Sequence, residues 1–140
     1  MQDLLLFINH HLAMFSVLAI VLILLIIIET IKLKNASTRL TPAQVITLVN
    51  HQKGVIIDIR SSEAFATGNI TGAISLPKND IKTKIKKIES FKSRPLVIVC
   101  ATGSDSSGVA AQLAQQGFQV HILNGGIRAW RNAEMPLIKG

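Results

Sequence analysis

The chain has 140 residues, and 15 Lys and Arg against 8 Asp and Glu give it a formal net charge of +7. This length suits one domain with a sizeable core, and a single cysteine excludes an intramolecular disulfide framework and favours a reducing compartment. No aromatic residues interleave with the lysines and no known reading motif accompanies them, so nucleic acid is not an expected partner.

A long apolar stretch lies near the N-terminus. Residues 12–28 contain Ser16 as their only polar side chain, and a helix that crosses a bilayer needs about 17 to 25 such residues. A cleaved signal peptide is the competing interpretation, but no basic region precedes the stretch and no small-residue cleavage site follows it. We therefore predict a short N-terminal segment over 1–11, a transmembrane helix in contact with lipid over 12–31, a polar tether over 32–39 and a domain over 40–140.

Charges on the two sides of this stretch predict its orientation. Lys32, Lys34 and Arg39 follow it, whereas Asp3 is the only formal charge before it. The positive-inside rule then predicts a single-pass inner-membrane protein with its N-terminus outside and its domain in the cytoplasm. His10 and His11 precede the span, but two histidines do not make a metal site, so no metal is expected.

The domain begins with signals for a helix and a buried strand. Thr41-Pro42-Ala43-Gln44 combines a helix cap, a proline in the first turn and a Gln that can close a capping box. Residues 55–59 follow as a buried strand, with Asp58 and Arg60 near the carboxyl end, where ligands collect in parallel sheets. An ion pair that ties down loops is the favoured interpretation of these two residues, and Ser61 to Glu63 predicts the start of another helix.

Lysines dominate the segment over 78–94. Ile81, Ile85 and Ile88 lie on one helical stripe, and the lysines lie outside or at the edges of it. A solvated face is the first interpretation of this pattern. A face toward an anionic leaflet is the second, because the predicted tether holds the domain near the membrane.

Residues 96–100 are apolar without alternation, which predicts a strand buried on both faces of a parallel sheet. Cys100 ends this strand, and a Gly- and Ser-rich loop follows, with Ser106 or Ser107 expected as N-cap of a helix that closes at Gly117. A helix N-terminus and converging amides can depress a cysteine pKa from about 8.5 to roughly 3.5–7.5, and they also bind anions. The alternative is that Cys100 is simply a small buried residue at a strand end.

The chain closes with one more strand and one more helix. Residues 120–123 predict the strand, in which His121 is expected to be a hydrogen-bonded sheet histidine, and Trp130 is expected to pack in the last helix. Short apolar strands that alternate with capped helices predict an α/β domain with a parallel sheet.

The segment around Cys100 resembles the active-site loop of rhodanese domains, which consists of a cysteine, a six-residue cradle with glycine at its fourth position, and a helix. Three further segments of the chain resemble this family, namely 55–65, 68–77 and 117–136. The similarity spans about residues 38–138. It implies a parallel five-stranded sheet with helices on both faces.

The resemblance also implies sulfur transfer without a cofactor. The Cys100 thiolate would take sulfane sulfur from a small donor as a persulfide and pass it to an acceptor, either a small molecule or a protein thiol. The implied active-site loop, whose amides would stabilise the sulfur anion, comprises Ala101, Thr102, Gly103, Ser104, Asp105 and Ser106. The implied supporting residues are Asp58, Arg60 and Glu63.

Two residues depart from the family pattern. Asp105 stands where the family commonly has arginine, and Asn69 stands in place of a histidine. Asp105 predicts weak use of dianionic thiosulfate and better use of a less charged persulfide, whereas Asn69 is expected to affect only local packing.

A non-catalytic, membrane-tethered binding or scaffold module of the same fold is the alternative function. The absence of Lys and Arg between Cys100 and Arg128 favours this module, whereas Cys100 and Gly103 favour the enzyme. A phosphatase of the related cysteine-loop-arginine type is excluded, because residues 101–107 contain no arginine.

Overall fold

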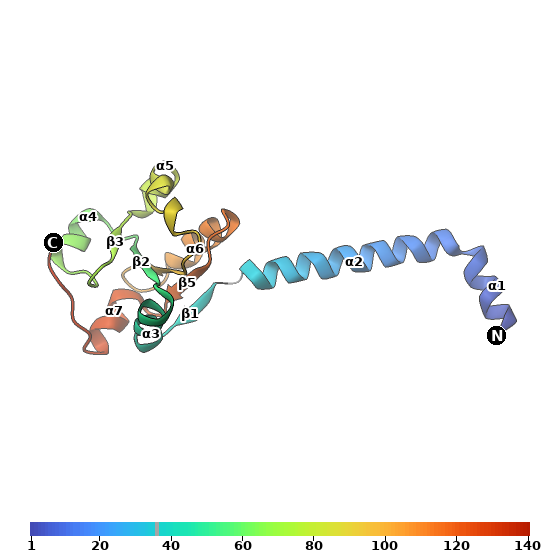
Figure 1. Cartoon of the computed structure of the whole chain (residues 1–140), viewed down its shortest axis with the longest axis horizontal. Coiled ribbons are helices and arrows are strands. Elements are labelled where there is room, and N and C mark those ends of the chain that lie inside the picture. The colour runs from blue at the N-terminus through green and yellow to red at the C-terminus, as the bar shows by residue number, and fades with distance from the viewer. Residues whose placement is uncertain (36) are drawn as a thin grey trace. The chain divides into compact units, whose positions relative to one another are not determined.

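The computed structural model describes residues 1–35 and 37–140, and the side chains of 32–35 lie outside that description. The chain forms two compact units, Met1–Ala36 and Ser37–Gly140 (Figure 1).

The first unit consists of helices α1 (Gln2–His10) and α2 (Leu12–Asn35). Within α2, Leu12–Ile31 has a mean hydropathy of 3.0 and none of it is buried inside the structure. Among the described residues this is the one helix that is long and apolar enough to cross a membrane. It is a candidate membrane anchor, and the same length and composition also fit a signal sequence.

The second unit is an α/β domain around one parallel sheet, as predicted. The five strands lie in the order β1-β5-β4-β2-β3, and all four neighbouring pairs are parallel. The strands are β1 (Thr38–Leu40), β2 (Val55–Asp58), β3 (Ile74–Ser75), β4 (Leu96–Val99) and β5 (Val120–Leu123). The longer helices are α3 (Pro42–Gln52), α4 (Ser62–Thr67), α6 (Ser106–Gln115) and α7 (Gly126–Asn132).

Helices cover both faces of the sheet, and the middle strand β4 is therefore apolar throughout. Ile57 and Ile98 pack on one face with Leu113 of α6. Ile56 and Val97 point to the other face, into a cluster that also holds Val45 of α3 and Trp130 of α7. Because successive side chains of a strand point to opposite faces, a strand between two helical layers has no solvent side and shows no alternation.

Two helix starts match the sequence patterns. The Gln44 amide donates to Thr41 Oγ1 at 3.3 Å and the Thr41 amide donates to Gln44 Oε1 at 2.9 Å, which completes the predicted capping box of α3. At α4 the Ala64 amide donates to Ser61 Oγ at 3.2 Å.

The link between the two units is shorter than predicted. Helix α2 continues to Asn35 and strand β1 begins at Thr38, so regular structure occupies much of the predicted tether 32–39, and Ala36 lies outside the described residues. Strand β1 forms because Thr38 pairs with His121 and Arg39 with Ile122. This short polar strand depends on a partner some 80 residues away, which no local pattern indicates.

The lysine-rich segment forms several short helical pieces instead of one helix. They are η1 (Lys78–Asp80), α5 (Ile81–Lys84), η2 (Ile85–Lys87) and η3 (Glu89–Phe91). Ile81 and Ile88 are buried as expected, with Ile85 partly buried. Tight turns such as the bond from the Ile88 amide to the Ile85 carbonyl at 3.1 Å interrupt the helix. The segment's lysines are exposed, and contact with lipid stays a prediction.

Candidate active site

Cys100 lies directly after β4, the middle strand of the sheet. Its side chain is 3% exposed and packs in the same cluster as Val109 and Ala110 of α6. The Gly103 amide donates a hydrogen bond to Cys100 Sγ at 2.9 Å. The loop from β4 to α6 therefore folds back over the sulfur and directs a backbone N–H at it.

Helix α7 holds the start of this loop in place. The Ile127 amide donates to the Cys100 carbonyl at 2.9 Å, and the Arg128 amide donates to the Ala101 carbonyl at 3.1 Å. This approach requires Gly126, which has φ +61°, because a Cβ there would overlap the Cys100 carbonyl oxygen and lie 2.8 Å from the Ala101 carbonyl carbon.

The loop glycine has a similar role. Gly103 is buried with φ +88°, and a Cβ there would lie 3.1 Å from the Gly125 nitrogen. A side chain at this position would be both strained and crowded, so the fold explains the glycine at the fourth position counted from Cys100.

The other loop residues mostly face solvent. Ala101, Thr102 and Ser104 are exposed, with the Thr102 and Ser104 hydroxyls 3.1 Å apart. Within the described residues the Gly103 amide is the one backbone N–H that bonds to the sulfur. The resemblance implied that backbone amides from Ala101 to Ser106 would stabilise the sulfur anion. Among the described residues, one of them, the Gly103 amide, donates a hydrogen bond to the sulfur.

The predicted helix cap is wrong. Helix α6 begins at Ser106, and its cap residue is Asp105, whose side chain makes no capping bond. Ser107 Oγ instead accepts a hydrogen bond from Arg39 Nη2 at 2.7 Å. Ser106 is fully buried, and its hydroxyl has no partner in the part of the chain that the structure describes. The Ser107 hydroxyl, one of the two that the local pattern offered as the helix cap, is therefore hydrogen-bonded to the Arg39 guanidinium of β1.

Asp105 faces a cation at the surface. Its carboxylate lies 3.1 Å from Lys78 Nζ, and the two side chains are 61% and 54% exposed. Opposite charge and solvent both weaken its field at the sulfur. From this exposed ion pair we expect a smaller penalty on thiosulfate than the sequence alone predicted.

Asp58 and Arg60 form the predicted ion pair. Arg60 Nη2 lies 2.7 Å from Asp58 Oδ2, with the side chains 8% and 1% exposed, and it also donates to the Gly68 carbonyl at 2.7 Å. The pair ties the end of β2 to the loop before β3, which supports the site indirectly. Glu63 is exposed in the first turn of α4 and does not line the cavity beside the loop.

Besides the predicted Arg60, the structure brings Arg39, Arg128 and Arg131 to the loop, which sequence reasoning did not place there. An open cavity of about 320 Å³ beside the loop is lined by Arg60, Ala101, Thr102, Ile127, Arg128, Arg131 and Asn132. On another side, Arg39 Nη1 lies 3.6 Å from the position that a Cβ of Gly103 would occupy. The lack of basic residues between Cys100 and Arg128 therefore does not leave the loop without cations, because they come from β1, from the end of β2 and from α7.

His121 was expected to be hydrogen-bonded within the sheet, and the structure does not show such a bond. Neither ring nitrogen has a hydrogen-bond partner among the described residues, and the half-buried ring lines a cavity with Gln44 and Thr47 of α3. Desolvation by burial lowers its pKa below the ordinary value. His121 does not line the arginine-bearing cavity, so it is not placed to act as a base there.

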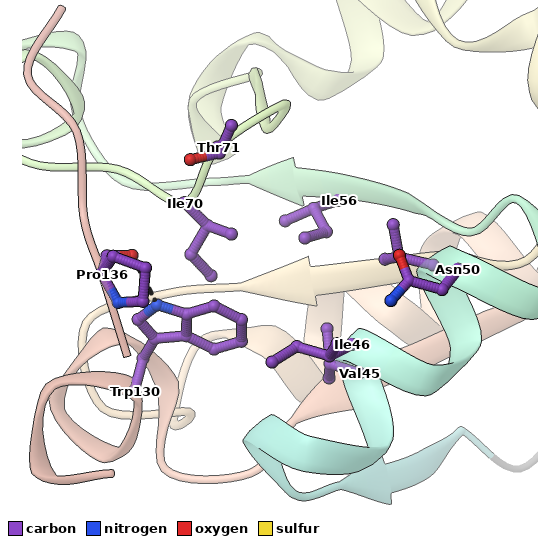
Figure 2. A pocket seen from close by; sticks show the side chains of 9 residues that line it. Val45, Ile46, Asn50, Ile56, Ile70, Thr71, Trp130 and Pro136 are labelled. Carbon is purple, nitrogen blue, oxygen red and sulfur yellow. Dashed lines mark hydrogen bonds between the residues drawn. The ribbon is translucent and has the colours of Figure 1, made fainter. Parts of the chain in front are cut away.

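A further cavity lies on the α3 and α7 face of the sheet. Figure 2 shows apolar side chains around the indole of Trp130, whose Nε1 donates to the Pro136 carbonyl at 3.0 Å. Trp130 is 4% exposed, as expected for a packing residue. The cavity has a volume of about 220 Å³, and no acid, base or thiol lines it. The Cys100 loop is therefore the candidate active site.

A five-stranded parallel sheet covered on both faces by helices, with a cysteine directly after its middle strand, is the architecture expected of a rhodanese domain. The chain belongs to the rhodanese-like family, since the model of the rhodanese-like domain matches residues 41–133.

The chain is also similar to individual known proteins. The BU052 protein of Buchnera aphidicola from Acyrthosiphon pisum is 31% identical, over 99% of this chain and 97% of its own length. The thiosulfate sulfurtransferase GlpE of Pseudomonas putida (strain F1) is 36% identical over 66% of this chain and 84% of its own. A rhodanese-related protein from Thermoplasma volcanium has a TM-score of 0.67 at 21% identity, over 74% of this chain and 99% of its own, and this likeness shows the fold.

Proposed function

We propose that the protein is a membrane-anchored sulfurtransferase that carries sulfane sulfur as a persulfide on Cys100. The observation that carries this proposal is the hydrogen bond that the Gly103 amide donates to the buried Cys100 Sγ at 2.9 Å. An N–H aimed at a buried sulfur stabilises negative charge on it, and both the attacking thiolate and the persulfide anion need that stabilisation. The similarity to a named thiosulfate sulfurtransferase supports the same chemistry.

The reaction has two balanced steps. The Cys100 thiolate attacks the sulfane sulfur of the donor, a sulfur–sulfur bond forms at Cys100, and the donor's own bond to that sulfur breaks. The leaving group departs with the bonding pair, as sulfite from thiosulfate or as a thiolate from a thiol persulfide. An acceptor thiolate then attacks the outer sulfur of the Cys100 persulfide and regenerates the Cys100 thiolate, so no external oxidant or reductant is consumed.

The test is transfer of one sulfur atom to the purified full chain in detergent. After exposure to thiosulfate or to glutathione persulfide, peptide mass spectrometry should find one added sulfur on Cys100, and an added thiol should remove it. Cys100→Ser is the matched control, because serine is nearly isosteric with cysteine and the fold should persist. A wild-type chain that gains no sulfur from either donor would support the non-catalytic binding module instead.

The second part of the proposal is the anchor: Leu12–Ile31 crosses the inner membrane with the domain in the cytoplasm. The support is the charge difference between Lys32, Lys34 and Arg39 after the helix and Asp3 before it. A reporter fused after Gly140 that is active only outside the cytoplasm should stay silent. A variant with Gln2→Lys, Lys32→Gln and Lys34→Gln should raise its activity, because the charge bias is weakened. Loss of the N-terminal segment from the mature chain would instead identify a signal sequence.

A further inference from the structure

Three guanidinium groups line the open cavity beside the Cys100 loop, and we call this cavity the arginine pocket. Arg60 comes from the end of β2, and Arg128 and Arg131 come from α7. Residues three apart on a helix are neighbours on its surface, so Arg128 and Arg131 present their charges together. Arg131 Nη2 also lies 3.9 Å from the position that a Cβ of Gly68 would occupy, and Arg60 Nη2 donates to the Gly68 carbonyl at 2.7 Å. The guanidinium groups of Arg60 and Arg131 therefore both lie close to Gly68.

The arginine pocket carries more positive than negative charge. Asp58 neutralises Arg60 at 2.7 Å. Across the described residues, no carboxylate forms an ion pair with Arg128 or Arg131, and both side chains are exposed. Glu134 follows α7 closely, but it is not paired with either arginine. The pocket therefore has two uncompensated cations beside the loop that carries the thiol, an arrangement that suits a carboxylate or another oxyanion.

The position of the pocket indicates which part of a ligand it would hold. Ala101 and Thr102, the two residues after Cys100, form part of its wall, whereas Cys100 itself does not. The backbone bond from the Arg128 amide to the Ala101 carbonyl, 3.1 Å long, fixes α7 against that wall. A ligand in the pocket would thus keep its non-reacting end among the arginines and extend its reacting end over the loop.

We propose that the arginine pocket binds the carboxylate groups of an anionic low-molecular-weight thiol persulfide, the sulfur donor of Cys100. This inference rests on the proposed function, and it names the donor class for the same site. The volume of about 320 Å³ lies at the lower end of the range of about 300 to 1,000 Å³ for small-molecule sites. In such a donor the charges are separated from the sulfane sulfur by several bonds. Thiosulfate carries its charge next to the transferred sulfur, so it has no separate anionic end for the pocket to hold.

The first experiment compares donors with the full chain in detergent. Glutathione persulfide carries two carboxylates, and cysteamine persulfide carries none. In the double variant Arg128→Gln with Arg131→Gln, KM for glutathione persulfide should rise about tenfold or more, because the loss of even one hydrogen bond to a charged group lowers affinity by about tenfold or more. The kcat should stay within about twofold, since neither arginine bonds to the sulfur, and KM for cysteamine persulfide should not rise.

The matched control is Lys82→Gln with Lys86→Gln. It removes the same formal charge from exposed positions on the lysine-rich segment, outside the pocket, and it should leave KM for both donors unchanged. An equal rise in KM in the control and the arginine variant would show a general charge effect and overturn the proposal. An unchanged KM for glutathione persulfide in the arginine variant would overturn it as well.

A binding readout separates this inference from the proposed function. In the Cys100→Ser chain, phenylglyoxal modification of Arg128 and Arg131, followed by mass spectrometry, should slow when glutathione is added and should not slow with cysteamine. Modification of Arg94, which lies outside the pocket, provides the internal reference. Absence of protection would refute the pocket even if Cys100 carries sulfur. Protection without any sulfur on wild-type Cys100 would support the pocket and refute the sulfur transfer.

Discussion

Replacement of Gly126 by alanine tests how α7 holds the Cys100 loop. The residue has φ +61°, and its new Cβ would overlap the Cys100 carbonyl oxygen and lie 2.8 Å from the Ala101 carbonyl carbon. These are backbone atoms, so no side-chain rotation relieves the contact. Helix α7 should move away from the strand end and weaken the bond from the Ile127 amide to the Cys100 carbonyl.

The magnitude follows from two separate costs. A left-handed backbone costs an alanine about 1–2 kcal/mol, and overpacking a closed contact costs about 1–3 kcal/mol. Gly126→Ala should therefore lower the free energy of unfolding by about 2–5 kcal/mol, a large part of the ~5–15 kcal/mol typical of a domain. Gly117→Ala is the matched control, because φ is +93° but no atom lies within 4 Å of the new Cβ. It should lower the free energy of unfolding only by the cost of the left-handed backbone.

The assay is urea unfolding of the full chain in detergent, followed by fluorescence of the single tryptophan, Trp130, which is buried in α7. Gly126→Ala should unfold at lower urea than Gly117→Ala, and sulfur loading of Cys100 should drop only in Gly126→Ala. Equal unfolding free energies in the two variants, with sulfur loading intact in both, would refute the argument that the contact between α7 and the loop positions the site.

Three further changes test the electrostatics. Asp58→Asn should cost about 3–5 kcal/mol of stability in urea unfolding, because it leaves the Arg60 guanidinium buried without its counter-ion; a loss below about 1 kcal/mol would contradict the ion pair's role. Asp105→Asn should change kcat/KM for thiosulfate by less than about fivefold, because the exposed pair with Lys78 contributes only about 0–1 kcal/mol; a gain of orders of magnitude would show that the carboxylate faces the donor. Burial lowers the pKa of His121, so the unfolded chain binds its proton more readily, and stability should fall as pH drops through the ordinary value of about 6.5. His121→Gln should flatten that fall when unfolding is measured at about pH 7.5 and about pH 5.5, and an unchanged pH dependence would assign it to other groups.

Much of the fold was predictable because its signals are local. The apolar runs at 12–31 and 96–100, and the caps at Thr41 and Ser61, depend on residues within one or two turns of each other. The neighbouring positions Asp58 and Arg60 likewise lie close enough in sequence to predict their ion pair. The position of Gly103 in the loop was also predictable, because Cys100, Gly103 and the helix start at Ser106 lie close together in the sequence.

Only the tertiary structure decided which cations lie beside the Cys100 loop. Arg39 and Ser107 are 68 positions apart in the sequence, and they form a hydrogen bond. Ser107 does not cap α6, whose cap residue is Asp105. Arg128 reaches the loop because the order β1-β5-β4-β2-β3 places β5, and hence the helix after it, beside β4. Strand order depends on the packing of both sheet faces at once, whereas periodicity and capping report only on neighbours along the chain. The sequence by itself therefore located the thiol and its loop, and the sheet determined which arginines lie beside that loop.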